Sequence, residues 1–401
     1  MNGRFIFGQR AARAGVAASA AALLVAGAAW YGGAAHAQSS RMATVTTPIA
    51  HAIAGGRESY ADIVDVASPA VVTIRTDGRA KMSSTQFQVP GDDLFEQFFE
   101  GRFGNGRGDG RGNGQRQAPR QRALGSGVIV TTDGYILTNH HVVDGAETIS
   151  VDLTDGRTLT ATLIGSDTPS DLALLKVPGH DFKALALGDS DAVKVGDVVL
   201  AVGNPLNIGQ TVTMGIISAK GRSTGPGDGS YEDFLQTDAP INHGNSGGAL
   251  VSMKGELVGI NSQILSNGGD GNIGIGFSIP VNMAKSVMEQ LRATGKVTRA
   301  QLGVTVQGVT SDIAQSLGLK ETRGAIVSGV TPGSAADRAG VKRGDVIESF
   351  NGQAVHDTNS LRNRVAQSGP GSAADLLIVR DGGERHVTVT LDEANPRVKK
   401  G

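Results

Sequence analysis

The stretch GVIVTTDGYILTNHHVV, residues 127–143, contains two apolar runs rich in β-branched residues, with Asp133-Gly134 between them. An Asp-Gly pair between two such runs is a strong signal for a β-hairpin, because both residues tolerate the positive φ of a tight turn. The stretch therefore predicts two antiparallel strands, and two adjacent histidines lie near its end.

The same pattern returns twice further along the chain. ISVDLTDGRTLTATLI repeats it around Asp155-Gly156, and ALVSMKGELVGINSQI repeats it around Lys254-Gly255. Six or more strands between residues 125 and 278 predict antiparallel barrels or sandwiches.

Composition indicates a globular protein with some loop-rich portions. The 401 residues suffice for two or three domains, 39% of them are hydrophobic, and 58 are glycines. A net charge of -1 gives no overall attraction to nucleic acid or to a membrane. The absence of cysteine excludes disulfides, thiolate metal ligands and a cysteine nucleophile.

The N-terminus has the pattern of an export signal. MNGRFIFGQRAAR is basic, an apolar alanine-rich run follows, and small residues flank His36 at Ala35-His36-Ala37. We expect a signal peptide over residues 1–37, cleaved before Gln38, and a periplasmic protein without stable membrane insertion. The alternative is an uncleaved inner-membrane anchor that faces the periplasm.

Residues 77–124 lose all periodicity and predict a long mobile loop. Its arginine-rich part resembles an RNA-binding tract, but aromatic residues that could stack on bases lie only at its flank, so we expect no nucleic-acid binding. The flanking LFEQFFEGRF, residues 94–103, is instead typical of a docking element.

Two further units follow the strands. PVNMAKSVMEQLRATG, residues 280–295, predicts a helix with one apolar stripe that Gly295 ends. Residues 301–391 mix short helical pieces with strands, ending in the hairpin LLIVRDGGERHVTVTL, and predict a small separate domain.

INHGNSGGAL, residues 241–250, surrounds Ser246 with glycines. A serine nucleophile needs a histidine base within hydrogen-bond reach. His140 and His141 end an apolar strand on opposite faces, so only one can face a cleft. We favour His141, because Val142 and Val143 then continue the core.

The base in turn needs a carboxylate that orients it. Asp171 opens the apolar run of PSDLALLKV and is the candidate, whereas its competitor Asp167 has the pattern of a turn residue. Gly244 would let its own N–H and that of Ser246 converge on an oxyanion. Alone, each of these residues is more often a turn or strand-end residue, and only their combination indicates catalysis.

The motifs TNHHVV, SDLALLKV and GNSGGAL, in this order, resemble those of the HtrA/Deg (Do-like) serine proteases, and QLGVTV resembles the start of their PDZ domain. The resemblance covers about residues 58–392. It implies an all-β chymotrypsin-like double β-barrel over residues 58–295, followed by a small α+β PDZ domain over 300–392. The T-N-x-H-V pattern of the family selects His141 over His140.

The resemblance also implies the roles of the site residues. His141 would be the base, Asp171 its orienting acid and Ser246 the nucleophile, with Gly244 and Ser246 forming the oxyanion hole. Substrate would contact these residues, Asn245, and the loop residues Ser262, Gln263, Ile264, Leu265 and Ser266. The PDZ domain would bind peptide C-termini through Leu302, Gly303, Val304, Thr305 and Val306.

The family implies an exported endopeptidase that degrades unfolded or damaged proteins, with chaperone activity beside proteolysis and without cofactor or metal. Residues 221–234 would be its sensor segment. Many members carry a second PDZ domain. Because this sequence shows one PDZ domain, we expect a homotrimer rather than a larger cage. The phenylalanine cluster around residues 95–103 is a candidate contact.

Two other functions fit single features of the sequence but not the whole pattern. GNSGG also fits the G-x-S-x-G elbow of α/β-hydrolases, but that fold requires a histidine after the serine, and only His356 and His386 follow. A chaperone without proteolytic activity is disfavoured by the complete set of triad residues.

The approach to Ser246, TDAPINHGNS, places Pro240 and Ile241 where a trypsin-like pocket would carry an acid. The opposite wall, NIGIGFSIP, is apolar. The sequence therefore predicts cleavage after small aliphatic residues, namely valine, isoleucine, alanine or leucine.

Overall fold

The computed structural model describes residues 59–79, 120–204, 209–224, 231–242, 244–264 and 273–394. The expected signal peptide and the phenylalanine cluster lie outside the described residues. Among the described residues, no helix combines the length and apolarity needed to cross a membrane.

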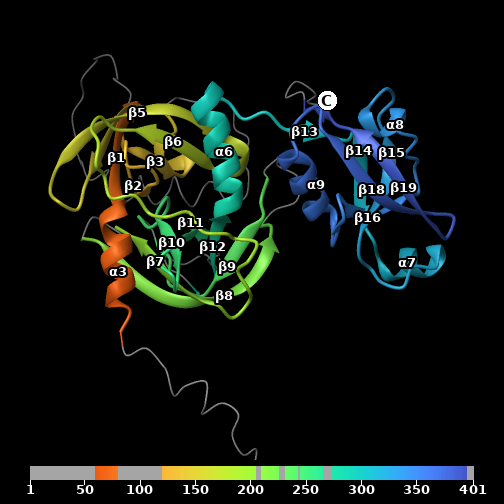
Figure 1. Ribbon diagram of the computed structural model, residues 1–401, viewed down its shortest axis with the longest axis horizontal. Helices are drawn as coiled ribbons and strands as arrows, with labels where there is room; N and C mark the ends of the chain where they lie inside the picture. The colour runs from red at the N-terminus through yellow and green to blue at the C-terminus, as the bar shows by residue number, and fades with distance from the viewer. Residues whose placement is uncertain are drawn as a thin grey trace, which may run out of the picture. The chain divides into compact units, whose positions relative to one another are not determined.

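The first half of the strand-rich region closes into a six-stranded antiparallel barrel (Figure 1). Its strand order is β1-β2-β3-β6-β5-β4. The expected hairpins at Asp133-Gly134 and Asp155-Gly156 join β2 to β3 and β4 to β5. The strands are β1 (Val71–Arg79), β2 (Arg120–Ile129), β3 (Tyr135–Thr138), β4 (Ala146–Asp152), β5 (Thr158–Asp167) and β6 (Leu172–Lys176).

The loop predicted over residues 77–124 overlaps the strands on both sides, so its predicted bounds were wrong. The ladder of β1 and β2 continues through the pairs Asp77–Arg122 and Arg79–Arg120. A strand ladder is formed by backbone N–H and C=O groups, so it extends beyond the apolar side chains that a sequence pattern detects. Only residues 80–119 of the expected loop lie outside the described residues.

A second six-stranded barrel follows, with the order β10-β11-β12-β9-β8-β7. The expected hairpin at Lys254-Gly255 joins β10 to β11. The barrel interior is an apolar cluster that includes Val199, Ile217 and Leu250. The strands are β7 (Val198–Gly203), β8 (Thr211–Arg222), β9 (Phe234–Thr237), β10 (Ala249–Ser252), β11 (Leu257–Ile264) and β12 (Gly276–Pro280).

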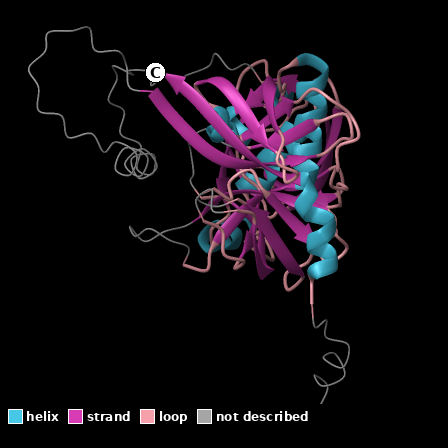
Figure 2. Ribbon diagram, turned by 90° about the vertical axis from the view of Figure 1, so that its left-hand side faces the viewer, coloured by secondary structure: helices cyan, strands magenta, loops and turns pink. Residues whose placement is uncertain are grey.

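Helices pack against parts of the barrels, and strands make up most of the elements drawn in Figure 2. The longest helix in the described part of the chain, α6 (Val281–Thr294), begins after Pro280 and is followed by Gly295, which has a φ of 72°. Its buried face contributes to a core that strands of both barrels share. The structure also describes α3 (Ala61–Ala67), α5 (His140–Val143) and the 3₁₀ turns η1 (Ser68–Ala70) and η2 (Thr168–Ser170) in this region.

Residues 300–394 form a separate core around an antiparallel sheet ordered β14-β15-β16-β18-β19. The strands are β14 (Val304–Gly308), β15 (Ala325–Val330), β16 (Val346–Phe350), β17 (Gln353–Ala354), β18 (Ala373–Arg380) and β19 (Gly383–Thr390), with β13 (Ala300–Gln301) paired to β20 (Asp392–Glu393). The helices are α7 (Ser311–Leu317), α8 (Ala335–Arg338) and α9 (Thr358–Gln367). The expected double barrel followed by an α+β domain is confirmed, and the α/β-hydrolase alternative is excluded.

Candidate active site

His141 and Asp171 are in direct contact. Nδ1 of His141 lies 2.9 Å from both Oδ1 and Oδ2 of Asp171, and the His141 backbone N–H donates to Oδ1 over 3.1 Å. Because an ionised carboxylate only accepts hydrogen bonds, the imidazole proton resides on Nδ1, and Nε2 is the basic nitrogen. The two side chains are 30% and 28% exposed, so solvent can reach the pair.

Asp171 has an uncommon backbone conformation. It ends η2 with φ 53° and ψ 41°, in the left-handed region that aspartate and asparagine tolerate better than most residues. Its carbonyl accepts hydrogen bonds from the His140 N–H and from Asn139 Nδ2. These bonds tie the start of α5 to Asp171, and therefore the base to its acid.

We expected both histidines at the end of a strand, and this was wrong in detail. Strand β3 ends at Thr138, and the two histidines open the helical turn α5. The His140 ring nitrogens lie near Ser166 Oγ and Thr168 Oγ1, at 3.2 and 3.1 Å, so His140 and His141 have different partners. Val142 and Val143 are buried as expected, although in a helix.

The competing acid Asp167 serves a different purpose. Its carboxylate accepts the Ser170 N–H in η2 and forms a bidentate ion pair with the Arg299 guanidinium. Its carboxylate is therefore engaged away from His141.

The Ser246 hydroxyl donates to the carbonyl of Ser262 over 3.0 Å. The Ser262 hydroxyl in turn donates to Oδ2 of Asp171 over 2.9 Å. Ser262 thus connects the nucleophile turn to the carboxylate. The sequence identified Ser262 only as a substrate-loop residue, and no local pattern indicates a contact between residues so far apart.

The turn that carries Ser246 presents two open donors. Within the described part of the chain, the N–H groups of Gly244 and Ser246 donate to no protein acceptor. Gly244 has a φ of 93°, which glycine adopts readily. Unpaired N–H groups are rare in folded proteins, so such a pair beside a serine is suited to bind a developing oxyanion.

Comparison with known proteins agrees with this geometry. A trypsin-like peptidase domain model matches residues 125–260, and a PDZ domain model matches residues 300–391. A probable periplasmic serine endoprotease DegP-like of Marinomonas sp. is 44% identical over 349 residues, which cover 85% of this chain and 72% of the relative. The chain belongs to the HtrA/Deg family of serine proteases.

Other family members are similarly close. The periplasmic pH-dependent serine endoprotease DegQ of Escherichia coli is 44% identical over 83% of this chain and 70% of its own length. A solved structure of the HtrA-type protease AlgW with a tripeptide has a TM-score of 0.65 and 41% identity, covering 85% of this chain and 99% of that one. The present HtrA/Deg protein is accordingly a periplasmic serine endopeptidase that acts on proteins or peptides. The periplasmic location expected from the sequence is confirmed, whereas signal cleavage remains a prediction.

Ile241, which we expected beside the specificity pocket, is buried in the HtrA/Deg chain. Ile241 is 1% exposed, and a Cβ on Gly276 would approach its Cδ1 to 2.9 Å. The acid nearest in sequence, Asp238, is turned onto β8, where it accepts the Ile216 N–H. Of the expected substrate loop, Leu265 and Ser266 lie outside the described residues, while Gln263 and Ile264 pair in the ladder of β11 and β12.

The expected peptide-binding segment of the PDZ domain lies at a sheet edge. β14, which contains Val304, Thr305 and Val306, pairs with β15 on one side and is the first strand of the sheet. Gly303 precedes it with a φ of 78°. An edge strand presents backbone groups to which an extended peptide can add.

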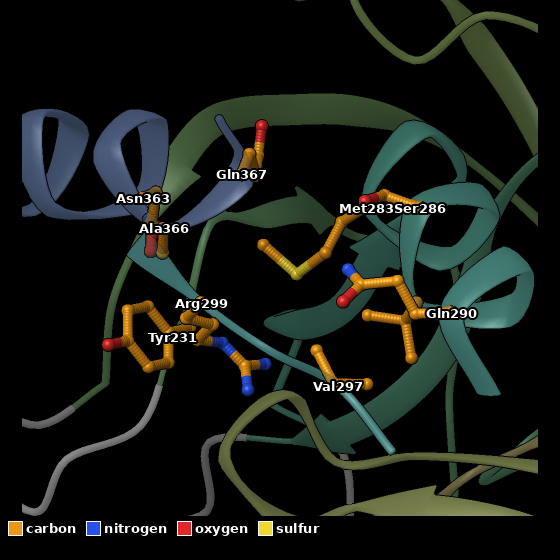
Figure 3. A pocket seen from close by; sticks show the side chains of 10 residues that line it. Tyr231, Met283, Ser286, Gln290, Val297, Arg299, Asn363, Ala366 and Gln367 are labelled. Carbon is orange, nitrogen blue, oxygen red and sulfur yellow. The ribbon is translucent and has the colours of Figure 1, made fainter. Parts of the chain in front are cut away.

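A small cavity of about 20 Å³, room for about one water, lies between α6 and α9 (Figure 3). Side chains of the two helices line opposite sides of it, together with Tyr231 and Arg299. No triad residue lines it. This is physically reasonable, because a protease that binds an extended chain needs an open groove rather than an enclosed cavity. Among the described residues, no cluster of three metal-ligating side chains occurs.

Proposed function

We propose that this HtrA/Deg endopeptidase degrades unfolded or damaged periplasmic proteins, with Ser246 as nucleophile, His141 as base and Asp171 as orienting acid. The observation that supports these roles is the contact of His141 Nδ1 with the Asp171 carboxylate, which leaves Nε2 to take a proton.

The reaction would proceed in two halves. The Ser246 hydroxyl transfers its hydrogen bond from the Ser262 carbonyl to His141 Nε2, gives up its proton there and adds to the scissile carbonyl carbon. The N–H groups of Gly244 and Ser246 bind the oxyanion, and the imidazolium returns the proton to the leaving amine. Water then hydrolyses the acyl-enzyme by the same steps.

Substrate selection would occur at two places. The apolar surroundings of Ile241 favour a small aliphatic side chain before the scissile bond. The PDZ domain would capture peptide C-termini through Leu302 and Gly303, with the peptide adding to β14, the first strand in the order of its sheet.

We further propose the domain bounds 58–295 and 300–392, a cleaved signal peptide over residues 1–37, chaperone activity and a homotrimer. The sensor segment, residues 221–234, would relay PDZ occupancy to the active site. In support, the Glu232 carbonyl accepts hydrogen bonds from Asn359 and Asn363 of α9, at 2.7 and 2.6 Å.

The test is digestion of unfolded β-casein by protein that begins at Gln38, beside the Ser246→Ala variant. We expect cleavage by the first and none by the second, with matching circular dichroism spectra. The double variant Ser246→Ala with His141→Ala should behave like Ser246→Ala alone, because the residues act as a unit. Casein cleavage by a folded Ser246→Ala variant would exclude the proposed nucleophile. Sizing of the same samples tests the trimer.

A further inference from the structure

Ser126, on β2 of the first barrel, holds both residues that carry the open N–H groups. Its backbone N–H donates to the Ser246 carbonyl over 2.8 Å. Its hydroxyl donates to the Gly244 carbonyl over 2.6 Å. Ser126 is fully buried, so these bonds do not compete with bulk water.

The direction of the Ser126 hydroxyl bond is fixed by a third residue. The backbone N–H of Asn204, just after β7, donates to Ser126 Oγ over 2.9 Å. A hydroxyl has one proton, and Oγ here already accepts from Asn204, so its proton goes to the Gly244 carbonyl. The Ser126 carbonyl is occupied as well, by the Thr138 hydroxyl at 2.7 Å.

The Gly244–Asn245 peptide is thereby held at both ends. Its C=O is bound by Ser126 Oγ, and its N–H, which belongs to Asn245, donates to the Asn242 carbonyl over 2.9 Å. Because a trans peptide is a rigid plane, two such bonds fix its orientation. The Ser246–Gly247 peptide, two peptides further along, is also held at both ends. Its C=O accepts the Ser126 N–H, and its N–H donates to the Asn261 carbonyl.

The two open donors belong to the peptide planes that alternate with these. The Ser246 N–H lies on the Asn245–Ser246 peptide, whose carbonyl accepts from the Gly248 N–H over 2.9 Å. The Gly244 N–H belongs to the peptide immediately before Gly244–Asn245, and the Gly244–Asn245 peptide is the one that Ser126 Oγ holds. Glycine has the widest backbone freedom of any residue, so its N–H keeps one direction only if its neighbours are fixed.

We propose that Ser126 is a positioning residue of the oxyanion hole: its hydroxyl holds the Gly244–Asn245 peptide so that the Gly244 N–H stays directed at the substrate carbonyl. The inference rests on the proposed roles of Gly244 and Ser246. Ser126 touches neither substrate nor reacting atoms, and it acts through Gly244. Without the hydroxyl, Gly244 can rotate and the oxyanion loses one of its two donors.

The test compares Ser126→Ala with Ser190→Ala. Ser190 is 1% exposed and its hydroxyl accepts the Asn282 N–H over 3.2 Å, so this control also removes a buried serine hydroxyl that binds a backbone N–H, but outside the active site. For each, kcat and KM are measured on a fluorogenic peptide with valine before the cleaved bond. Inhibition by a peptide ending in the boronic acid of valine is measured too, because the Ser246 adduct with boron mimics the tetrahedral intermediate.

Ser126→Ala should lower kcat about 10- to 100-fold, since loss of a whole oxyanion donor lowers it about 100- to 1,000-fold. KM should change little, and the boronate should bind more weakly by the same factor as kcat/KM. Substrate affinity, measured with Ser246→Ala also present, should remain. Ser190→Ala should lower the melting temperature while kcat stays within about twofold. If Ser126→Ala does not fold, Ser126→Cys takes its place. Its thiol is a weak donor, so kcat should fall, but by a smaller factor.

A folded Ser126 variant with unchanged kcat and unchanged boronate affinity, beside an inactive Ser246→Ala, would overturn this inference alone. An active Ser246→Ala would instead overturn the proposed function. Equal losses of kcat in Ser126→Ala and Ser190→Ala would reduce Ser126 to a merely structural role and so contradict the proposal.

Discussion

The hydroxyl of Ser262 donates to Oδ2 of Asp171 over 2.9 Å, while the backbone carbonyl of the same serine accepts the hydroxyl of Ser246. One residue therefore contacts two members of the triad through different atoms. A substitution that removes the Ser262 hydroxyl leaves the carbonyl in place, so the two contacts can be tested separately.

Ser262→Ala should lower kcat/KM about 10- to 100-fold, because a hydrogen bond to a carboxylate contributes about 1.5–3 kcal/mol and helps to hold Asp171 against His141. Steady-state kinetics on a fluorogenic peptide, with circular dichroism to establish folding, would measure it. Activity equal to that of the parent enzyme would show that the Asp171 carboxylate needs no support from Ser262.

Asp171→Asn and Asp171→Ala should separate catalysis from backbone strain. Asparagine tolerates the left-handed conformation with φ 53°, so Asp171→Asn should fold normally but lose about 10³- to 10⁴-fold in kcat, because the imidazole is no longer held in the correct tautomer. Asp171→Ala should lose similar activity and, in addition, about 1 kcal/mol of unfolding free energy. Urea denaturation measures the difference. Equal stabilities would mean that the backbone conformation stores no strain.

Cleavage sites in β-casein, mapped by mass spectrometry, should carry mostly valine, isoleucine, alanine or leucine before the scissile bond. Among the described residues, Ile241 is buried and lies against Gly276, and neither residue carries a carboxylate that could bind a basic side chain. Each well-fitted apolar group should contribute about 1–3 kcal/mol to selection. A majority of lysine or arginine at that position would refute the apolar pocket.

Stability should depend on pH through Asp233, which precedes β9. Burial, followed by the nearby Asp191 carboxylate, raises the pKa of Asp233 to about 6. A carboxyl whose pKa is raised on folding stabilises the fold fully below its unfolded value, near 3.8, and this stabilisation is lost as pH rises through 6.

Asp233→Asn should therefore unfold at a higher temperature than the parent at pH 7.5, with an advantage of about 1–2 kcal/mol that disappears near pH 4. Asp65→Asn, on the exposed face of α3, controls for the loss of one charge. A constant difference between Asp233→Asn and the parent across this range would contradict the assignment.

Local patterns predicted much of the architecture. The Asp-Gly and Lys-Gly turns located three hairpins, and the stripe ending at Gly295 located α6, because hairpins and helices form between residues close in sequence. These patterns did not predict how the barrels close. Closure requires the pairing of β1 with β4 and of β7 with β10, and these strands are distant in sequence.

The same distinction applies to the site. The triad candidates could be proposed from the combination of three local motifs, but the positioning contacts could not. Ser262 and Asp171 are separated by 91 residues, and Ser126 and Gly244 by 118. Serine in a glycine-rich strand has no distinguishing pattern, and its function depends on which backbone the fold brings beside it.

If Ser246 is a nucleophile activated by His141, a fluorophosphonate should attach to the enzyme at Ser246. The serine oxygen would bond to phosphorus and fluoride would leave, giving one adduct per chain that peptide mapping assigns to Ser246. We expect no adduct in Ser246→Ala and labelling slower by at least about 10³-fold in His141→Ala. An adduct on another residue of the parent enzyme, or labelling at an unchanged rate in His141→Ala, would contradict these roles of Ser246 and His141.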